Sequence, residues 1–116
     1  MYSGWNNIGF QNGLLVHDYT STGLTMPNNP NPNMGPGGDL GQGKLRPNHA
    51  EIWVSGNAIR WRADGKEPTS DSGMFVPANS YLNFTDADFQ YAGFLANLKM
   101  ISMGPGDAIL EIAYFD

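Results

Sequence analysis

Apolar and polar residues alternate through most of the second half of the chain, with the two-residue period of β-strands. The segments HAEIWVS (49–55) and NAIRWRA (57–63) are such runs, and the Ser55-Gly56-Asn57 sequence between them is typical of a β-hairpin turn. Ala50, Ile52 and Val54 share one face of the first run, with Glu51 and Trp53 on the other. In the second run Ile59, Trp61 and Ala63 share one face. We therefore expect an antiparallel hairpin over residues 49–63 with its apolar face in a core.

Further strands are predicted at 74–77, 80–85, 97–103 and 107–115, with Gly104-Pro105-Gly106 making a hairpin of the last two. The last segment is apolar on both faces, which indicates a central strand, or one face in the core and the other in a subunit contact. A short helical turn is expected within residues 86–95. We count six to eight strands and no long helix, which predicts an all-β fold: a small β-sandwich or jelly-roll-like barrel.

The first part of the chain is different. Residues 27–48 hold five Gly, five Pro and five Asn and almost no apolar side chains. Fixing the backbone of such a segment costs roughly 1–2 kcal/mol per residue, or roughly 20–40 kcal/mol in total. We expect that contacts with another polypeptide supply this free energy. The sequence thus predicts an extended Gly/Pro/Asn-rich arm over 1–48, with one short strand at 13–19, and a β-sandwich domain over 49–116.

The first ten residues of this arm contain four apolar residues with 3-3-2 spacing, separated mainly by Gly and Asn. They are Tyr2, Trp5, Ile8 and Phe10. This spacing fits neither a helix nor a strand cleanly, and two interpretations stay open. The residues either anchor the arm on a partner, or belong to an edge strand that folds back on the domain.

Charge and composition exclude several classes of function. The net charge is −5 and no basic stripe exists, so binding of nucleic acid through phosphates is not expected. No apolar run reaches the roughly 20 residues of a membrane span, and we expect no secretory signal. The chain has no Cys, and His17 and His49, interpreted as surface or loop residues, lack acids at ligand spacing. We expect no metal, no cofactor and no catalytic activity.

The segment IRWRADGKEPT (59–69) places Arg60 and Arg62 on one face of a strand beside Trp61, with Lys66 in the following turn. Arg60, Arg62 and Lys66 are the candidate partner-binding residues of the β-domain, because guanidinium groups bind carboxylates and phosphates and pack on sugar or aromatic rings. The alternative is that the two arginines pair with acids on an adjacent strand or a neighbouring subunit, with Trp61 in the core.

The order of these motifs resembles that of small virion proteins of tailed phages. In that group an R-[WY]-R-x-D-G-x-x-P-[TS] segment and a closing L-x-[VI]-x-Y-[YF] strand recur, and here they correspond to residues 60–69 and the terminal strand. The resemblance covers residues 50–115. It implies a β-sandwich or jelly-roll domain, often trimeric, that cements or decorates the exterior of a capsid by bridging copies of the major capsid protein. It implies no catalytic residues.

Two other functions stay open. The first is a tail, neck or head-fibre component of the same kind of particle. The second belongs to another class, a carbohydrate-binding module with Trp53, Trp61 or Tyr81 as its stacking platform.

Overall fold

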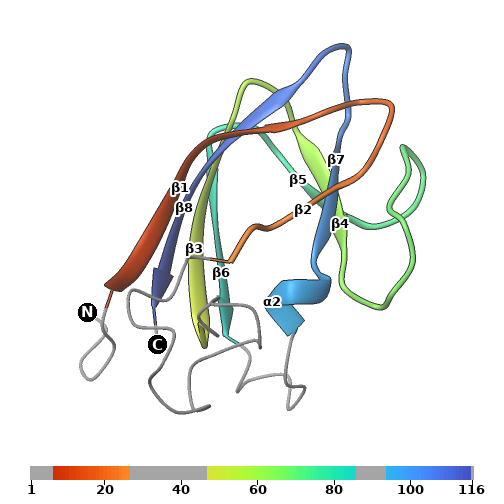
Figure 1. The fold of residues 1–116 in the computed structure, drawn as a ribbon. Helices are drawn as coiled ribbons and strands as arrows, with labels where there is room; N and C mark the ends of the chain where they lie inside the picture. The colour runs from red at the N-terminus through yellow and green to blue at the C-terminus, as the bar shows by residue number, and fades with distance from the viewer. Residues whose placement is uncertain (1–6, 27–46, 86–93, 116) are drawn as a thin grey trace.

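The computed structural model describes residues 7–26, 47–85 and 94–115 (Figure 1). These residues form eight strands and one short helix, joined by turns and loops. In chain order they are β1 (Asn7–Val16), β2 (Thr22–Gly23), β3 (His49–Ser55), β4 (Ile59–Arg62), β5 (Met74–Val76), β6 (Ser80–Thr85), α2 (Phe94–Asn97), β7 (Lys99–Ser102) and β8 (Ala108–Phe115). The segments predicted at 49–55 and 80–85 coincide with β3 and β6.

The strands form two four-stranded antiparallel sheets that face each other. The first sheet has the order β1-β8-β3-β6 and the second has the order β2-β7-β4-β5. These two orders are those of an eight-stranded jelly roll. The predicted all-β sandwich is confirmed.

Both predicted hairpins are wrong. β3 pairs with β6 and β8, whereas β4 pairs with β5 and β7, so the turn at residues 56–58 carries the chain from one sheet to the other. The turn between β7 and β8 does the same. The turn residues were correctly located, because Gly56 has a φ of +82°. A turn sequence shows where the chain reverses. It does not determine whether the next strand joins the same sheet as the previous strand or the facing sheet.

The core lies between the sheets and is built from the inward residues of the alternating strands. The predicted inward faces are confirmed: Ala50, Ile52 and Val54 are completely buried, as are Ile59 and Leu110. β8 lies between β1 and β3, which confirms it as a central strand. The helix α2 lies at one end of the sandwich beside β7 and adds its own buried residues, Phe94 and Leu95 (Figure 1).

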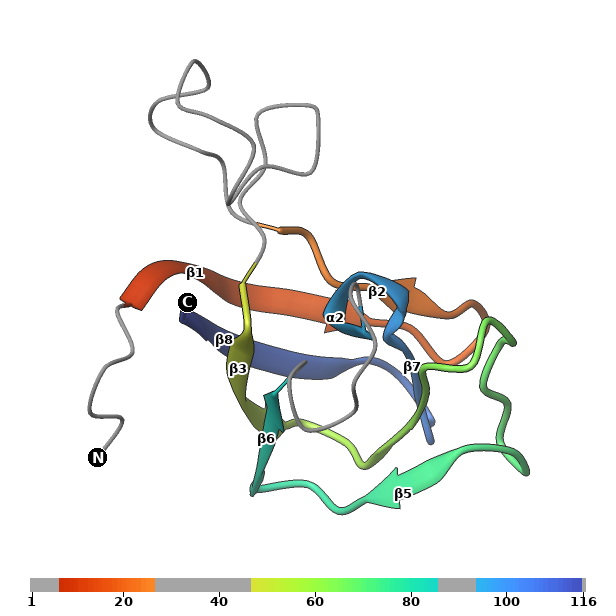
Figure 2. The ribbon, with the colours of Figure 1, turned by 90° about the horizontal axis from the view of Figure 1, so that it is seen from below.

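The N-terminal part of the chain belongs to the sandwich, which corrects the expected division at residue 48. β1 pairs with β8 from Asn7 to Val16, and the two strands lie side by side in Figure 2. Residues 22–23 form β2 of the second sheet. For residues 7–12 the edge-strand interpretation therefore describes the structure. Residues 1–6 and 27–46, with the expected anchors Tyr2 and Trp5, lie outside the described residues.

A hydrogen bond inside the sandwich shows why β1 is not a detached arm. Bulges near Gly9 and Gly13 shift the register of β1 so that Gln11 points inward while Phe10 points outward. The Gln11 side-chain oxygen accepts a hydrogen bond from the hydroxyl of Tyr114 at 3.0 Å. Tyr114 is completely buried, and its hydroxyl would otherwise lose a partner on leaving water.

Candidate functional site

The outer side of the first sheet is rich in apolar and aromatic side chains. Cross-strand partners in an antiparallel sheet share a face, so the register defines which residues lie together. We call this surface the aromatic face, and its apolar members are Phe10, Leu15, Trp53, Tyr81, Ile109, Ala113 and Phe115. All four strands contribute at least one of them.

Several of these side chains are open to solvent. Phe10 is 65% exposed, Tyr81 68%, and Leu15 48%. The rings of Trp53 and Tyr81 pack against each other with centroids 4.7 Å apart. An exposed apolar surface that runs across a whole sheet is typical of a surface that another macromolecule covers.

The charge of the aromatic face has one sign. Its four strands carry two glutamates, Glu51 and Glu111, and neither Lys nor Arg. Glu111 accepts a hydrogen bond from the backbone N–H of Gly13 at 3.1 Å, which fixes its carboxylate at the bulge of β1. Glu51 lies 3.6 Å from the Nε2 atom of His49. A complementary surface would therefore present apolar residues and at least one cationic group.

Of the predicted anchors, Ile8 and Phe10 lie on opposite sides of β1. Ile8 packs against the core, whereas Phe10 pairs with Ala113 on the aromatic face. Ile8 is thus placed to hold β1 on the sandwich, and Phe10 is available to a partner.

Arg60 and Arg62 fold back on their own domain. Arg60 donates to the carbonyl oxygens of Ser70 (3.1 Å) and Gly73 (2.9 Å), and its guanidinium lies 5.6 Å from the ring centre of Phe75. Arg62 binds the Asp64 carboxylate and the Ser72 hydroxyl.

The hydrogen bond with Arg62 lowers the pKa of Asp64 to about 2. The described contacts thus tie the loop between β4 and β5 to β4. Lys66 lies exposed on that loop, and its backbone N–H donates to Asp64 at 3.3 Å. A role of Arg60, Arg62 or Lys66 in binding a partner stays a prediction.

Three further residues singled out from the sequence, Trp61, His49 and His17, make contacts within the domain. Trp61 is half-buried and meets Phe84 edge-on, with ring centroids 4.9 Å apart, so it bridges the two sheets. His49 is buried, with its Nδ1 atom 2.9 Å from the Thr85 hydroxyl, which corrects its interpretation as a surface or loop residue. The Nδ1 atom of His17 lies 2.9 Å from the carboxylate of Asp107.

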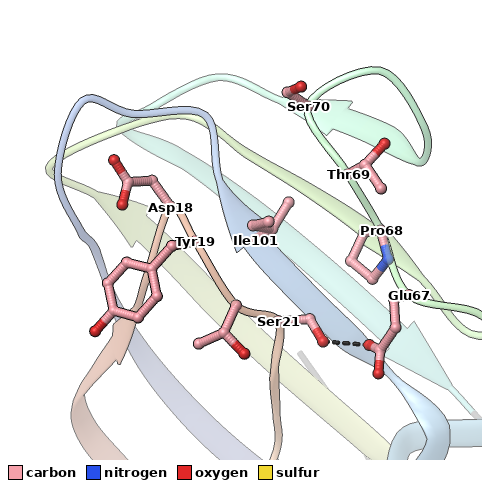
Figure 3. Close-up of a pocket in the computed structure, with 9 residues that line it drawn as sticks. Asp18, Tyr19, Ser21, Glu67, Pro68, Thr69, Ser70 and Ile101 are labelled. Carbon is pink, nitrogen blue, oxygen red and sulfur yellow. Dashed lines mark hydrogen bonds between the residues drawn. The ribbon is translucent and has the colours of Figure 1, made fainter.

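A second feature is a hollow of about 440 Å³ over the outer side of the second sheet (Figure 3). The residues after β1 form one side, those before the short Thr69–Ser72 bridge form the other, and Ile101 of β7 lies between them. It is lined by Asp18, Tyr19, Thr20, Ser21, Glu67, Pro68, Thr69, Ser70 and Ile101.

Two other features are absent from the described residues. Within residues 7–26, 47–85 and 94–115, no group of three or more His, Asp or Glu side chains could hold a metal ion. In the same part of the chain, no helix is long and apolar enough to cross a membrane.

The sequence contained part of the signal for the aromatic face. Apolar residues on both sides of the last strand indicated either a central strand or an outer face in a subunit contact. The contribution of β1 depends on its bulges. The hollow could not be predicted from the sequence, because its two sides come from distant segments: Ser21 and Glu67 are 46 residues apart.

No protein-family model matches the chain, and no curated protein or solved structure matches it either.

Proposed function

We propose that this chain is a structural virion protein that decorates a phage capsid and binds the major capsid protein through its aromatic face. The observation that carries the proposal is the exposed apolar surface across all four strands of the first sheet. Tyr81 and Phe10 are about two-thirds exposed on it. The sequence resemblance to virion proteins of tailed phages supplies the identity of the particle, and jelly rolls are common in viral capsids.

The proposed partner surface has a defined chemistry. Burial of the aromatic rings supplies most of the binding free energy, at about 25 cal/mol per Å² of apolar surface removed from water. Glu51 and Glu111 require Lys or Arg side chains opposite them, because a carboxylate buried without a partner opposes binding. We therefore expect the capsid surface to be apolar with a basic rim, and the association to weaken as the salt concentration rises.

The test is co-sedimentation of the purified chain with empty shells of the major capsid protein from the same genome. Phe10→Ala removes an outward ring from β1, and we expect at least a tenfold loss of affinity, which corresponds to about 1.4 kcal/mol. The matched control is Phe75→Ala on β5 of the second sheet, where the ring is 52% exposed. This control should bind as the wild type does.

Two results would contradict the proposal. One is a wild-type chain that does not sediment with the shells at any salt concentration. The other is equal binding by the Phe10→Ala and Phe75→Ala variants, which would remove the aromatic face from the interface. Urea unfolding of both variants checks that each is folded, so that a loss of binding cannot be attributed to unfolding.

Self-association into a trimer is part of the same proposal, because the resemblance implies it. Light scattering on the isolated chain and on the chain released from shells measures its oligomeric order. Placement on a tail, neck or head fibre is the alternative within the same class. It predicts that the chain sediments with tail or neck assemblies and not with empty shells.

A carbohydrate-binding function is the alternative of another class, and the contact between Trp53 and Tyr81 favours it. These two adjacent rings lie on the aromatic face and could form a platform for a sugar. Trp61 does not belong to such a platform, since it packs on Phe84 and Phe94. A glycan that binds the wild type and not Tyr81→Ala would support this alternative.

A further inference from the structure

The hollow beside Ile101 lies on the opposite side of the sandwich from the aromatic face. Ile101 pairs with Arg60, and both point outward from the second sheet, since the residues next to them in β7 and β4 are packed inward. A molecule docked through the first sheet would leave this hollow open. The hollow can therefore hold a ligand whether or not the aromatic face is covered.

One rim of the hollow is an oriented aromatic ring. Tyr19 is 77% exposed, and its ring stacks on that of His17 with centroids 5.1 Å apart and an angle of 17°. Asp107 holds the His17 ring through its Nδ1 atom at 2.9 Å. His17 thus covers one face of the Tyr19 ring, and the ring extends outward from the rim, away from Ile101 (Figure 3). It extends the hollow as an aromatic platform for the apolar face of a ligand.

Carboxylates with fixed positions lie on both sides of the hollow. Asp18 accepts a hydrogen bond from the backbone N–H of Gly106 at 3.0 Å. Glu67 accepts one from the Ser21 hydroxyl (Figure 3) and another from Lys99 Nζ at 3.0 Å. The hydrogen bonds from Ser21 and then from Lys99 lower the pKa of Glu67, so its carboxylate is ionised at neutral pH.

These contacts leave free acceptor capacity for a ligand. An ionised carboxylate offers about four lone-pair sites, of which Asp18 and Glu67 each use only some. The exposed hydroxyls of Thr69 and Ser70 line the same hollow. Pro68 and Ile101 add apolar surface between these polar groups.

The charge of the hollow selects among ligands. Asp18 and Glu67 both line the hollow, and Lys99, which is not a lining residue, contacts only Glu67. The excess of negative charge disfavours phosphate, sulfate and carboxylate groups. A neutral molecule with several hydroxyls and an apolar ring face satisfies both the acceptors and the tyrosine. The volume of about 440 Å³ falls within the range of about 300–1,000 Å³ that small-molecule sites occupy.

We propose that this hollow binds a neutral saccharide, with Tyr19 stacking on a sugar ring and Asp18 and Glu67 accepting hydrogen bonds from its hydroxyls. The site is independent of the proposed capsid contact.

The test is binding of the full chain to an array of neutral, sialylated and sulfated glycans. We expect neutral glycans only, and we expect Tyr19→Ala to weaken binding of the best one at least tenfold in a titration followed by NMR. The matched control is Tyr81→Ala, which removes an equally exposed ring from the aromatic face. This control should retain glycan binding.

Three outcomes would overturn the inference: no neutral glycan bound at millimolar concentration, a preference for sulfated or sialylated glycans, or a loss with Tyr81→Ala and not with Tyr19→Ala. Co-sedimentation of Tyr19→Ala with capsid shells, expected to match the wild type, keeps this test separate from that of the proposed function.

Discussion

The hydrogen bond between Gln11 and Tyr114 offers a direct test of whether β1 is part of the sandwich. Gln11→Ala leaves the buried Tyr114 hydroxyl without its 3.0 Å acceptor. Burial raises the pKa of Tyr114, so the hydroxyl stays protonated and still needs an acceptor. An unsatisfied buried hydroxyl costs about 1–3 kcal/mol, and we expect the free energy of unfolding to fall by this amount.

Tyr114→Phe distinguishes the cost of leaving the Tyr114 hydroxyl unsatisfied from the net contribution of its hydrogen bond with Gln11. Removing the hydroxyl costs the net value of one hydrogen bond, about 0.5–1.5 kcal/mol. In the double variant no unsatisfied hydroxyl is left, so its cost should be smaller than the sum of the single costs by about 0.5 kcal/mol or more. The control is Asn12→Ala, the next residue of β1, which is exposed and should change stability by less than about 0.5 kcal/mol.

Equilibrium unfolding in urea, followed by tryptophan fluorescence, measures these free energies. Hydrogen exchange of the isolated protein should also show protected amides between Phe10 and Val16, where β1 pairs with β8. If Gln11→Ala costs no more than Asn12→Ala and these amides exchange rapidly, β1 is a detachable arm and the reasoning is refuted.

Two further predictions concern the loop that Arg60 and Arg62 hold. Gly73→Ala should cost about 1–3 kcal/mol in urea unfolding, because at a φ of +126° its Cβ would lie 2.9 Å from a backbone oxygen; an equal cost for Gly23→Ala, where φ is not positive and the nearest contact of the Cβ would be an ordinary 3.5 Å, would contradict this. The lowered pKa of Asp64 means that its contribution to stability is present above pH 3.8 and is lost as the pH falls towards about 2. Asp64→Asn should therefore flatten the dependence of Tm on pH between about 4 and 2, and an unchanged slope would disprove the contact.

Much of the architecture could be predicted from the alternation of residue types. The two-residue period located β3 and β6 and assigned the buried face of β3, because burial of every second side chain is a local property of a strand. The apolar character of both sides of β8 likewise predicted its central position. The class of fold follows from these local facts.

The candidate sites were less accessible to sequence reasoning. Arg60 and Arg62 were correctly placed on one face of a strand. Asp64 lies only two residues from Arg62, but the partners Ser70, Ser72 and Gly73 lie ten to thirteen residues away in a loop whose course depends on packing. Phe10 was singled out as an anchor that binds a partner, which stays a prediction, and its neighbours on the aromatic face come from β8. No spacing within β1 indicates them.

The sequence by itself determined most of the strands after residue 48, where the chain reverses there and which apolar side chains are buried, since each depends on residues a few positions apart. Tertiary structure alone decided which strands pair, because a turn such as Ser55–Asn57 permits a hairpin or a crossing between sheets with the same residues. Packing of the two sheets selects the crossing: it buries the apolar faces of β3 and β4 against one another's sheets. That choice brings β1 beside β8, and so creates both the aromatic face and the hollow behind it.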